Sequence, residues 1–238
     1  MSPSASDRQA PLRTRIKICG LTREQDVDAA VAAGADAVGF VLYDRSPRHV
    51  TPERAAALAQ RLPPWVTPVL LFVNEDATRV MAASARVAGA MLQFHGDESP
   101  AQCEAAAQNG LRPYLRAARI PLGADAPRFD LVKYAAEYAR ARAILLDAHV
   151  QGYGGGGKTF DWSLLPPSVD AHLVLSGGLT PANVGDGIAA LRPRARTLAV
   201  DVSSGVERDG HKGIKDPDKI QAFVAAVRAA DARLSAIQ

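Results

Sequence analysis

The chain has 238 residues, of which 47% are hydrophobic and 22% are charged, a composition typical of globular proteins. Its formal net charge is only +3, and no cluster of lysine and arginine residues is visible, so the sequence predicts no nucleic-acid partner. No apolar segment approaches the roughly 18 residues that a membrane-spanning helix needs, so we expect no membrane association.

Residues 1–14 are polar and lack the apolar segment of a secretory signal, and we interpret them as a flexible N-terminal extension without a packing role. Residues 15–238 are expected to form a single catalytic domain. The two cysteines, Cys19 and Cys103, are too few for a disulfide framework and fit a reducing compartment. These features predict a cytoplasmic protein.

From Arg15 onward, short apolar runs alternate with longer helical patterns. Most of these runs are continuously apolar, as strands that are covered on both faces must be. The predicted strands are residues 15–20, 37–43, 68–73, 89–96, 112–118, 143–148, 172–178 and 197–205.

The segments between the strands are rich in Ala, Leu, Val, Glu and Arg and predict helices. Thr22 and Gln25 have the spacing of a capping box, and Gly34 is suited to end that helix. Thr51 and Thr180 each precede a proline, which is favoured at the first helical position. The predicted helices are residues 23–34, 52–62, 76–88, 99–110, 129–142, 181–191 and 216–234, with a weaker one after residue 160.

Repeated strand–helix units in a chain of this size favour an α/β fold of the closed (β/α)₈ or TIM-barrel type over an open doubly wound sheet. In such a barrel the functional groups gather where the strands end. The predicted strand ends carry cysteine, glycine and polar residues, whereas the segments that lead into the strands carry none of note. This asymmetry indicates an enzyme.

The segment "GYGGGGKT", residues 152–159, matches the pattern of a loop that binds nucleotide phosphates. Such a loop needs a helix directly after it, but Pro166 and Pro167 leave room for hardly two turns. A glycine-rich lid over an active site fits better, because glycines supply hinge freedom. The predicted lid residues are Gly154, Gly155, Gly156, Gly157 and Lys158.

Two other glycine-containing segments, "SGGLTP" and "DVSSGV", end the seventh and eighth predicted strands. Barrels often bind a phosphate group there through backbone N–H groups. Gly177, Gly178 and Gly205 would let the backbone approach the anion, and Ser203 or Ser204 could donate a hydroxyl group. The alternative is that the glycines only form tight turns, but two such strand ends side by side favour phosphate binding.

Four further side chains stand at strand ends or in the loops that follow. Asp147 follows an apolar strand, where a carboxylate is costly unless it is paired or functional, so we favour a role in a site. Cys19, taken alone, is typical of inert core packing. His95 is as consistent with a site residue as with a hydrogen-bonded strand end, and Arg48 is either solvated or a guanidinium fork for a carboxylate. No group of residues has metal-binding spacing, so no metal is predicted.

The ordered blocks of the sequence resemble the phosphoribosylanthranilate isomerase family from about Arg15 to the last helix. The blocks are "KICGLT", "GADAVGFVLYDRSPRHV", "FVN", "QFHGDES", "LLDA…GYGGGGKTFDW", "LSGGLTPANV" and "DVSSGVE". The departures are Phe94, where the family usually has leucine, and residues 1–14, which have no counterpart. The resemblance implies a (β/α)₈ barrel that acts in tryptophan biosynthesis on a small phosphorylated substrate, without a cofactor or metal.

The resemblance also implies residue roles. Cys19 would be the general base and Asp147 the general acid, and Arg48 would grip the anthranilate carboxylate. The substrate phosphate would lie by "SGG" and "SSG", and His95 and Asp201 would line the pocket. The implied reaction is an Amadori rearrangement of N-(5-phosphoribosyl)anthranilate to the 1-deoxyribulose phosphate. To act as the base, the thiol must have a lowered pKa or be deprotonated by its surroundings.

Three alternatives stay open at this point. The first is another phosphate-binding barrel isomerase or synthase, although Cys19 stands where a histidine-pathway isomerase would need an aspartate. The second is a nucleotide-binding protein that uses Lys158. The third is a barrel that binds a phosphorylated ligand without turnover. The oligomeric state is expected to be a monomer or a homodimer.

Overall fold

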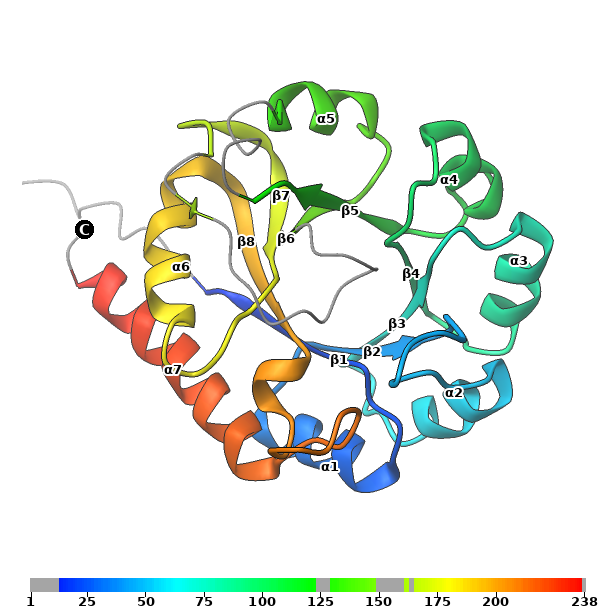
Figure 1. Ribbon diagram of the computed structural model, residues 1–238, viewed down its shortest axis with the longest axis horizontal. Helices are drawn as coiled ribbons and strands as arrows, with labels where there is room; N and C mark the ends of the chain where they lie inside the picture. The colour runs from blue at the N-terminus through cyan, green and yellow to red at the C-terminus, as the bar shows by residue number, and fades with distance from the viewer. Residues whose placement is uncertain (1–12, 123–128, 149–160, 163–164, 237–238) are drawn as a thin grey trace, which may run out of the picture.

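The structure is a computed structural model that describes residues 13–122, 129–148, 161–162 and 165–236. In this part of the chain, eight parallel strands pair in sequence order and β8 pairs with β1, which closes the barrel (Figure 1). The predicted (β/α)₈ barrel is confirmed. The strands are β1 (Arg15–Cys19), β2 (Ala37–Val41), β3 (Thr67–Phe72), β4 (Met91–Phe94), β5 (Tyr114–Ile120), β6 (Ala143–Ala148), β7 (Val169–Leu175) and β8 (Ala195–Val202).

Each strand directs its side chains alternately towards the helices and into the barrel interior, because successive residues point to opposite faces of a sheet. On β1, Ile16 and Ile18 belong to the main core, which lies between the sheet and the helices. Lys17 and Cys19 alternate with them and therefore point into the barrel interior. A small apolar cluster from β5, β6 and β7 fills part of that interior. The strands are thus buried on both faces, which accounts for their continuous hydrophobicity.

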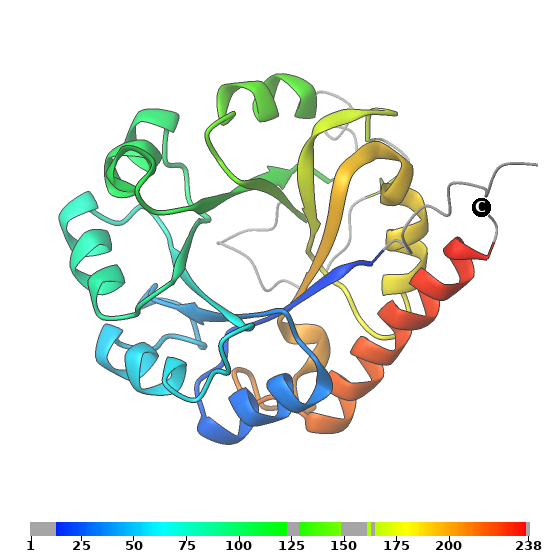
Figure 2. The same ribbon diagram turned by 180° about the vertical axis from the view of Figure 1, so that it is seen from behind.

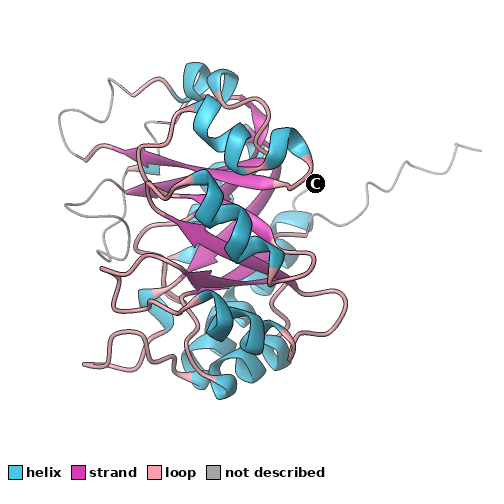
Figure 3. Cartoon of the chain, turned by 90° about the vertical axis from the view of Figure 1, so that its right-hand side faces the viewer, coloured by secondary structure: helices cyan, strands magenta, loops and turns pink. Residues whose placement is uncertain are grey.

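The helices form an outer ring around the strands, as both end-on views show (Figures 1 and 2). The side view places the strands in the middle, with helices on both sides (Figure 3). None of the described helices is long and apolar enough to cross a membrane. The helices are α1 (Glu24–Ala33), α2 (Pro52–Ala59), α3 (Ala77–Ala85), α4 (Pro100–Ala106), α5 (Leu131–Glu137), α6 (Val184–Leu191) and α7 (Pro217–Ser235). The weak helix expected after residue 160 falls partly on residues 163–164, outside the described residues.

The predicted helix boundaries are right at some ends and wrong at others. The Thr51 side chain caps α2 by accepting a hydrogen bond from Arg54 N, and Gly34 ends α1 at a φ of 92°. The capping box predicted at Thr22 is wrong, because its hydroxyl group donates to the Gly213 carbonyl oxygen instead. Helix α6 begins at Val184 rather than at the residue after Thr180.

The start of β1 is attached to α7, the last helix of the chain. Thr14 is fully buried, and its N–H and hydroxyl groups donate to the Asp231 carboxylate at 2.7 and 2.5 Å. Arg13 donates to Asp36. The prediction that residues 1–14 lack packing contacts is therefore wrong at its last two residues, because Thr14 is bound to Asp231 of α7 and Arg13 to Asp36, which directly precedes β2. Residues 1–12 lie outside the described residues.

Candidate active site

A cavity of 70 Å³ opens where the strands end at the centre of the barrel. It is lined by residues that follow or end strands β1, β2, β3, β6, β7 and β8, which are far apart in the sequence. The predicted site residues that line it are Cys19, Arg48, Asp147, Gly177, Gly178, Asp201, Ser203 and Ser204. The expectation that the site lies at the ends of the strands agrees with this geometry.

Cys19 and Asp147 enter this cavity from non-adjacent strands, β1 and β6. Their exposed fractions are 4% and 5%, so both side chains are shielded from bulk water. Burial raises the pKa of the Cys19 thiol above its ordinary value, although the charge of Lys17 opposes this effect. Lys17 by itself therefore does not give the lowered thiol pKa that a base requires, because desolvation outweighs the neighbouring cation.

Asp147 is held by a hydrogen-bonded chain from β4. His95 Nε2 lies 2.9 Å from Asp147 Oδ2, and Gln93 Nε2 lies 3.0 Å from His95 Nδ1. With the amide in this orientation, Nδ1 accepts from Gln93 and Nε2 carries the proton donated to Asp147. A 180° rotation of the amide exchanges its donor and acceptor, which would let Nε2 accept a hydrogen bond from a protonated Asp147. The chain can therefore satisfy both protonation states of the carboxyl group.

A second polar chain joins side chains from β1, β8 and the end of β7. Lys17 Nζ donates to Asp201 Oδ1 at 2.8 Å, and Ser176 Oγ donates to Asp201 Oδ2 at 3.2 Å. Burial acts most strongly on Lys17 and lowers its pKa, but the charges of Asp201 and Cys19 outweigh it and raise the pKa overall. Lys17 is therefore a buried, charged lysine with Asp201 as its counter-ion.

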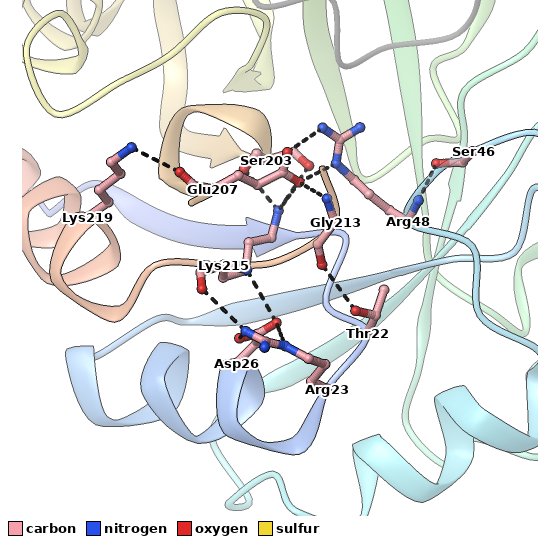
Figure 4. A network of polar contacts seen from close by, with 10 residues as sticks. All are labelled: Thr22, Arg23, Asp26, Ser46, Arg48, Ser203, Glu207, Gly213, Lys215 and Lys219. Carbon is pink, nitrogen blue, oxygen red and sulfur yellow. Dashed lines mark hydrogen bonds and ion pairs between the residues drawn. The ribbon is translucent and has the colours of Figure 1, made fainter. Parts of the chain in front are cut away.

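Arg48 is already engaged by a carboxylate of the protein (Figure 4). Its Nε and Nη2 atoms donate to the two oxygens of Glu207 at 2.7 and 2.9 Å. This is the bidentate geometry that the sequence suggested for a substrate carboxylate. Among the described residues Nη1 has no recorded protein partner, so this edge of the guanidinium is the one available to a ligand.

Lys215 connects Arg48 to the end of β8. Its ammonium group is fully buried and donates to Glu207 Oε1 at 3.1 Å and to the Ser203 carbonyl oxygen at 2.9 Å. Gly213 N also donates to Glu207 Oε1, at 3.0 Å. Burial lowers the pKa of Lys215. Burial is also the largest influence on the Glu207 carboxyl and acts to raise its pKa, but the hydrogen bonds and charges of Arg48 and Lys215 together lower that pKa overall. One charge network thus positions both Arg48 and the turn after β8 that contains Ser203 and Ser204, here called the serine turn.

The glycines after β7 and β8 are required for two different structural reasons. Gly177 and Gly178 have φ angles of 77° and 62°, a region that residues with a side chain rarely adopt. Gly205 does not line the cavity. A Cβ atom on it would overlap the carbonyl oxygen of Leu179, so it permits the turn after β8 to pack on the loop after β7. These close approaches leave Ser203 and Ser204 facing the cavity.

A larger groove of 660 Å³ lies beside the central cavity, over α2 and α3. Arg45 and His49 line this groove, whereas Arg48 lines the central cavity. The basic cluster suggested by the segment "DRSPRHV" is therefore divided between two surfaces. Neither Cys19 nor Asp147 lines this groove.

The predicted lid residues, Gly154 to Gly157 and Lys158, lie outside the described residues. Among the residues that the structure does describe, no group of three or more His, Cys, Asp and Glu side chains could hold a metal ion.

Residues 16–226 match the family model of N-(5′-phosphoribosyl)anthranilate isomerases. The chain belongs to this family. Over 94% of its length it is 60% identical to the N-(5′-phosphoribosyl)anthranilate isomerase of Methylibium petroleiphilum, 99% of which is covered. It is thus an isomerase of tryptophan biosynthesis.

Solved structures of the family have the same fold. The phosphoribosylanthranilate isomerase of Thermotoga maritima matches with a TM-score of 0.77 and 39% identity, and the match covers 91% of this chain and 99% of that chain. A family structure in complex with reduced 1-(o-carboxyphenylamino)-1-deoxyribulose 5-phosphate matches with a TM-score of 0.71 and 34% identity over the same shares of the two chains. The choice between monomer and homodimer stays a prediction.

Sequence reasoning missed four members of the site: Lys17, Gln93, Glu207 and Lys215. Two of them carried a signal. Lys17 stands two residues before Cys19 on β1, and Gln93 on β4 stands two residues before His95, which directly follows that strand. The period of two therefore places each on the same face as its partner. Glu207 and Lys215 follow the last strand and meet Arg48 only in three dimensions.

Proposed function

We propose that this isomerase catalyses the Amadori rearrangement of N-(5′-phosphoribosyl)anthranilate with Asp147 as general acid and Cys19 as general base. The observation that carries the proposal is that the two side chains line one buried cavity from strands β1 and β6. A sugar bound between them would have one group on each side. Each positioned proton transfer contributes about 10²–10⁴-fold to the rate.

The reaction divides into two proton transfers. Asp147 donates a proton to the ring oxygen of the ribose, and the nitrogen lone pair opens the ring to an iminium ion. Cys19 then removes the acidified C2′ proton, which gives an enolamine that tautomerises to the ketone. The Gln93–His95 chain supports the first transfer, since it can hydrogen-bond to Asp147 before and after it loses its proton.

The substrate's two anionic groups have separate partners in this proposal. The phosphate would bind at the ends of β7 and β8, by Gly177, Gly178, Ser203 and Ser204. The anthranilate carboxylate would bind the Nη1 edge of Arg48, whose other edge is occupied by Glu207. Asp201 would act beside Cys19 rather than on the substrate, because its oxygens are bonded to Lys17 and Ser176.

The test is the loss of phosphoribosylanthranilate, followed by anthranilate fluorescence, with purified variants. Cys19→Ala and Asp147→Asn should each abolish turnover while the circular dichroism spectrum stays unchanged. Cys103→Ala is the matched control, because that buried cysteine lies in the outer core. Near-normal turnover by Cys19→Ala would show that the assigned base is wrong. Binding of a product analogue without turnover by the unmodified protein would favour a non-catalytic barrel.

A further inference from the structure

The lysine two residues before Cys19 gives the proposed base a buried positive charge. Lys17 has an exposed fraction of 4%, and it shares the interior face of β1 with Cys19. A buried lysine in a barrel interior needs a reason, because removing an ammonium group from water is costly. Asp201 supplies a counter-ion, but a fully apolar interior would need neither charge.

The Cys19 thiol and the Lys17 ammonium group both lie against Gly39 on the neighbouring strand β2, which sets an upper limit on the distance between them. A Cβ atom on Gly39 would lie 2.6 Å from Cys19 Sγ and 3.1 Å from Lys17 Nζ, so glycine leaves the space that both side chains occupy. The sum of these two distances is the upper limit of the Sγ–Nζ separation. It falls in the range of about 4–6 Å within which an opposite charge favours ionisation.

We propose that Lys17 is a positioning residue for the Cys19 thiolate, with its ammonium group supplying the positive charge against which the thiol ionises and with Asp201 attenuating that charge. This inference rests on the proposed function, in which Cys19 is the base. Cys19 with Lys17 and Asp201 forms a cluster whose net charge is zero when the thiol is protonated and −1 when it is ionised. Burial and Asp201 therefore favour the protonated thiol, and Lys17 favours the thiolate.

The other groups around the thiol do not replace Lys17. From β2 and β3, Cys19 meets the apolar side chains of Val41, Leu71 and Val73, with Tyr43 partly buried against them. Arg48 and Asp147 line the same cavity, but Arg48 is paired with Glu207 and Asp147 with His95. Lys215 also lowers the pKa of Cys19, but by less than Lys17 does.

Two substitutions should move the thiol in opposite directions. Lys17→Met removes the cation and should raise the pH at which Cys19 ionises by about one to three units. Asp201→Asn keeps a hydrogen-bond acceptor for Lys17 but removes the competing anion, so the same transition should move to lower pH. Loss of structure alone would not shift the ionisation of Cys19 to higher pH in one variant and to lower pH in the other.

The transition is measured directly as the ultraviolet absorbance of the thiolate during a pH titration, with the trace of the matching Cys19→Ser protein subtracted. Cys103, whose pKa burial raises to about 12, cancels in this difference. If Lys17→Met leaves the transition in place, or if both variants shift it in the same direction, the inference is wrong. Absence of any transition in Lys17→Met up to the pH of unfolding counts as the expected upward shift.

The isomerase assay separates this inference from the proposed function. If the titrations shift as expected but Cys19→Ser retains full turnover, Lys17 does promote ionisation of the thiol, but Cys19 is not the general base. If Cys19→Ser is inactive but the titrations do not move, the base holds and the role of Lys17 fails. In Asp201→Asn, the acid limb of the kcat/KM profile should move to lower pH together with the thiol.

Discussion

Replacing Glu207 with glutamine removes the negative charge that Arg48 and Lys215 share. The substitution keeps the size of the side chain, but it leaves a guanidinium group with an exposed fraction of 7% and a fully buried ammonium group. Loss of one partner of a buried ion pair destabilises proteins by about 3–5 kcal/mol. In a domain of this size that corresponds to a fall in Tm of about 10 °C.

The pH dependence of Glu207→Gln tests the same reasoning. Lys215 has a lowered pKa in the folded protein, so the unfolded chain binds its proton more readily and stability rises with pH in the range between the two pKa values. Removing Glu207 lowers the Lys215 pKa further. The stability deficit of the variant should therefore shrink as the pH rises from neutral towards alkaline values, and Glu207→Gln/Lys215→Met should recover much of the loss.

Urea unfolding followed by circular dichroism measures these stabilities, and the isomerase assay measures the consequence for binding. Because Arg48 loses its bidentate anchor, KM should rise more than kcat falls. Glu24→Gln, which breaks an exposed pair with Arg54, is the matched control and should leave the unfolding midpoint unchanged. A loss of less than about 1 kcal/mol in Glu207→Gln, the size typical of surface pairs, would refute the argument.

Two further predictions concern the turn after β8 and the start of β1. Gly205→Ala should destabilise the protein by about 1–3 kcal/mol and raise KM, because its Cβ atom would overlap the Leu179 carbonyl oxygen and displace the serine turn. Gly185→Ala, whose Cβ atom would meet only the flexible end of Arg233 and Ala230, is its control, and equal KM values for the two variants would contradict the explanation. Asp231→Asn should lower the free energy of unfolding by about 2 kcal/mol, because the carboxylate accepts from Thr14 and Arg192, yet leave kcat unchanged. A fall in kcat at full folding would show that this contact also shapes the site.

Local sequence patterns predicted most of the architecture. Continuous apolar runs of strand length identify buried parallel strands, and their alternation with helical segments in one chain of this length indicates a barrel. Helix ends were less predictable, because Thr22 has both a suitable cap position and a distant acceptor in Gly213, and only the folded chain decides between them. The same holds for Thr14, whose partner Asp231 lies at the other end of the sequence.

For the site, the apolar runs of the sequence place Cys19 at the end of a strand and Asp147 next to the end of another, and the barrel topology brings such ends to one rim. The period of two along β1 was a signal, not used in the sequence analysis, that Lys17 shares the face of Cys19. The pairing of the charged side chains could be read only from the folded chain, in which Lys17 pairs with Asp201 and Glu207 occupies one edge of Arg48. Electrostatic pairing acts through space and depends on burial. The sequence shows which side chains can carry a charge, but their partners lie far away along the chain and are known only from the folded structure.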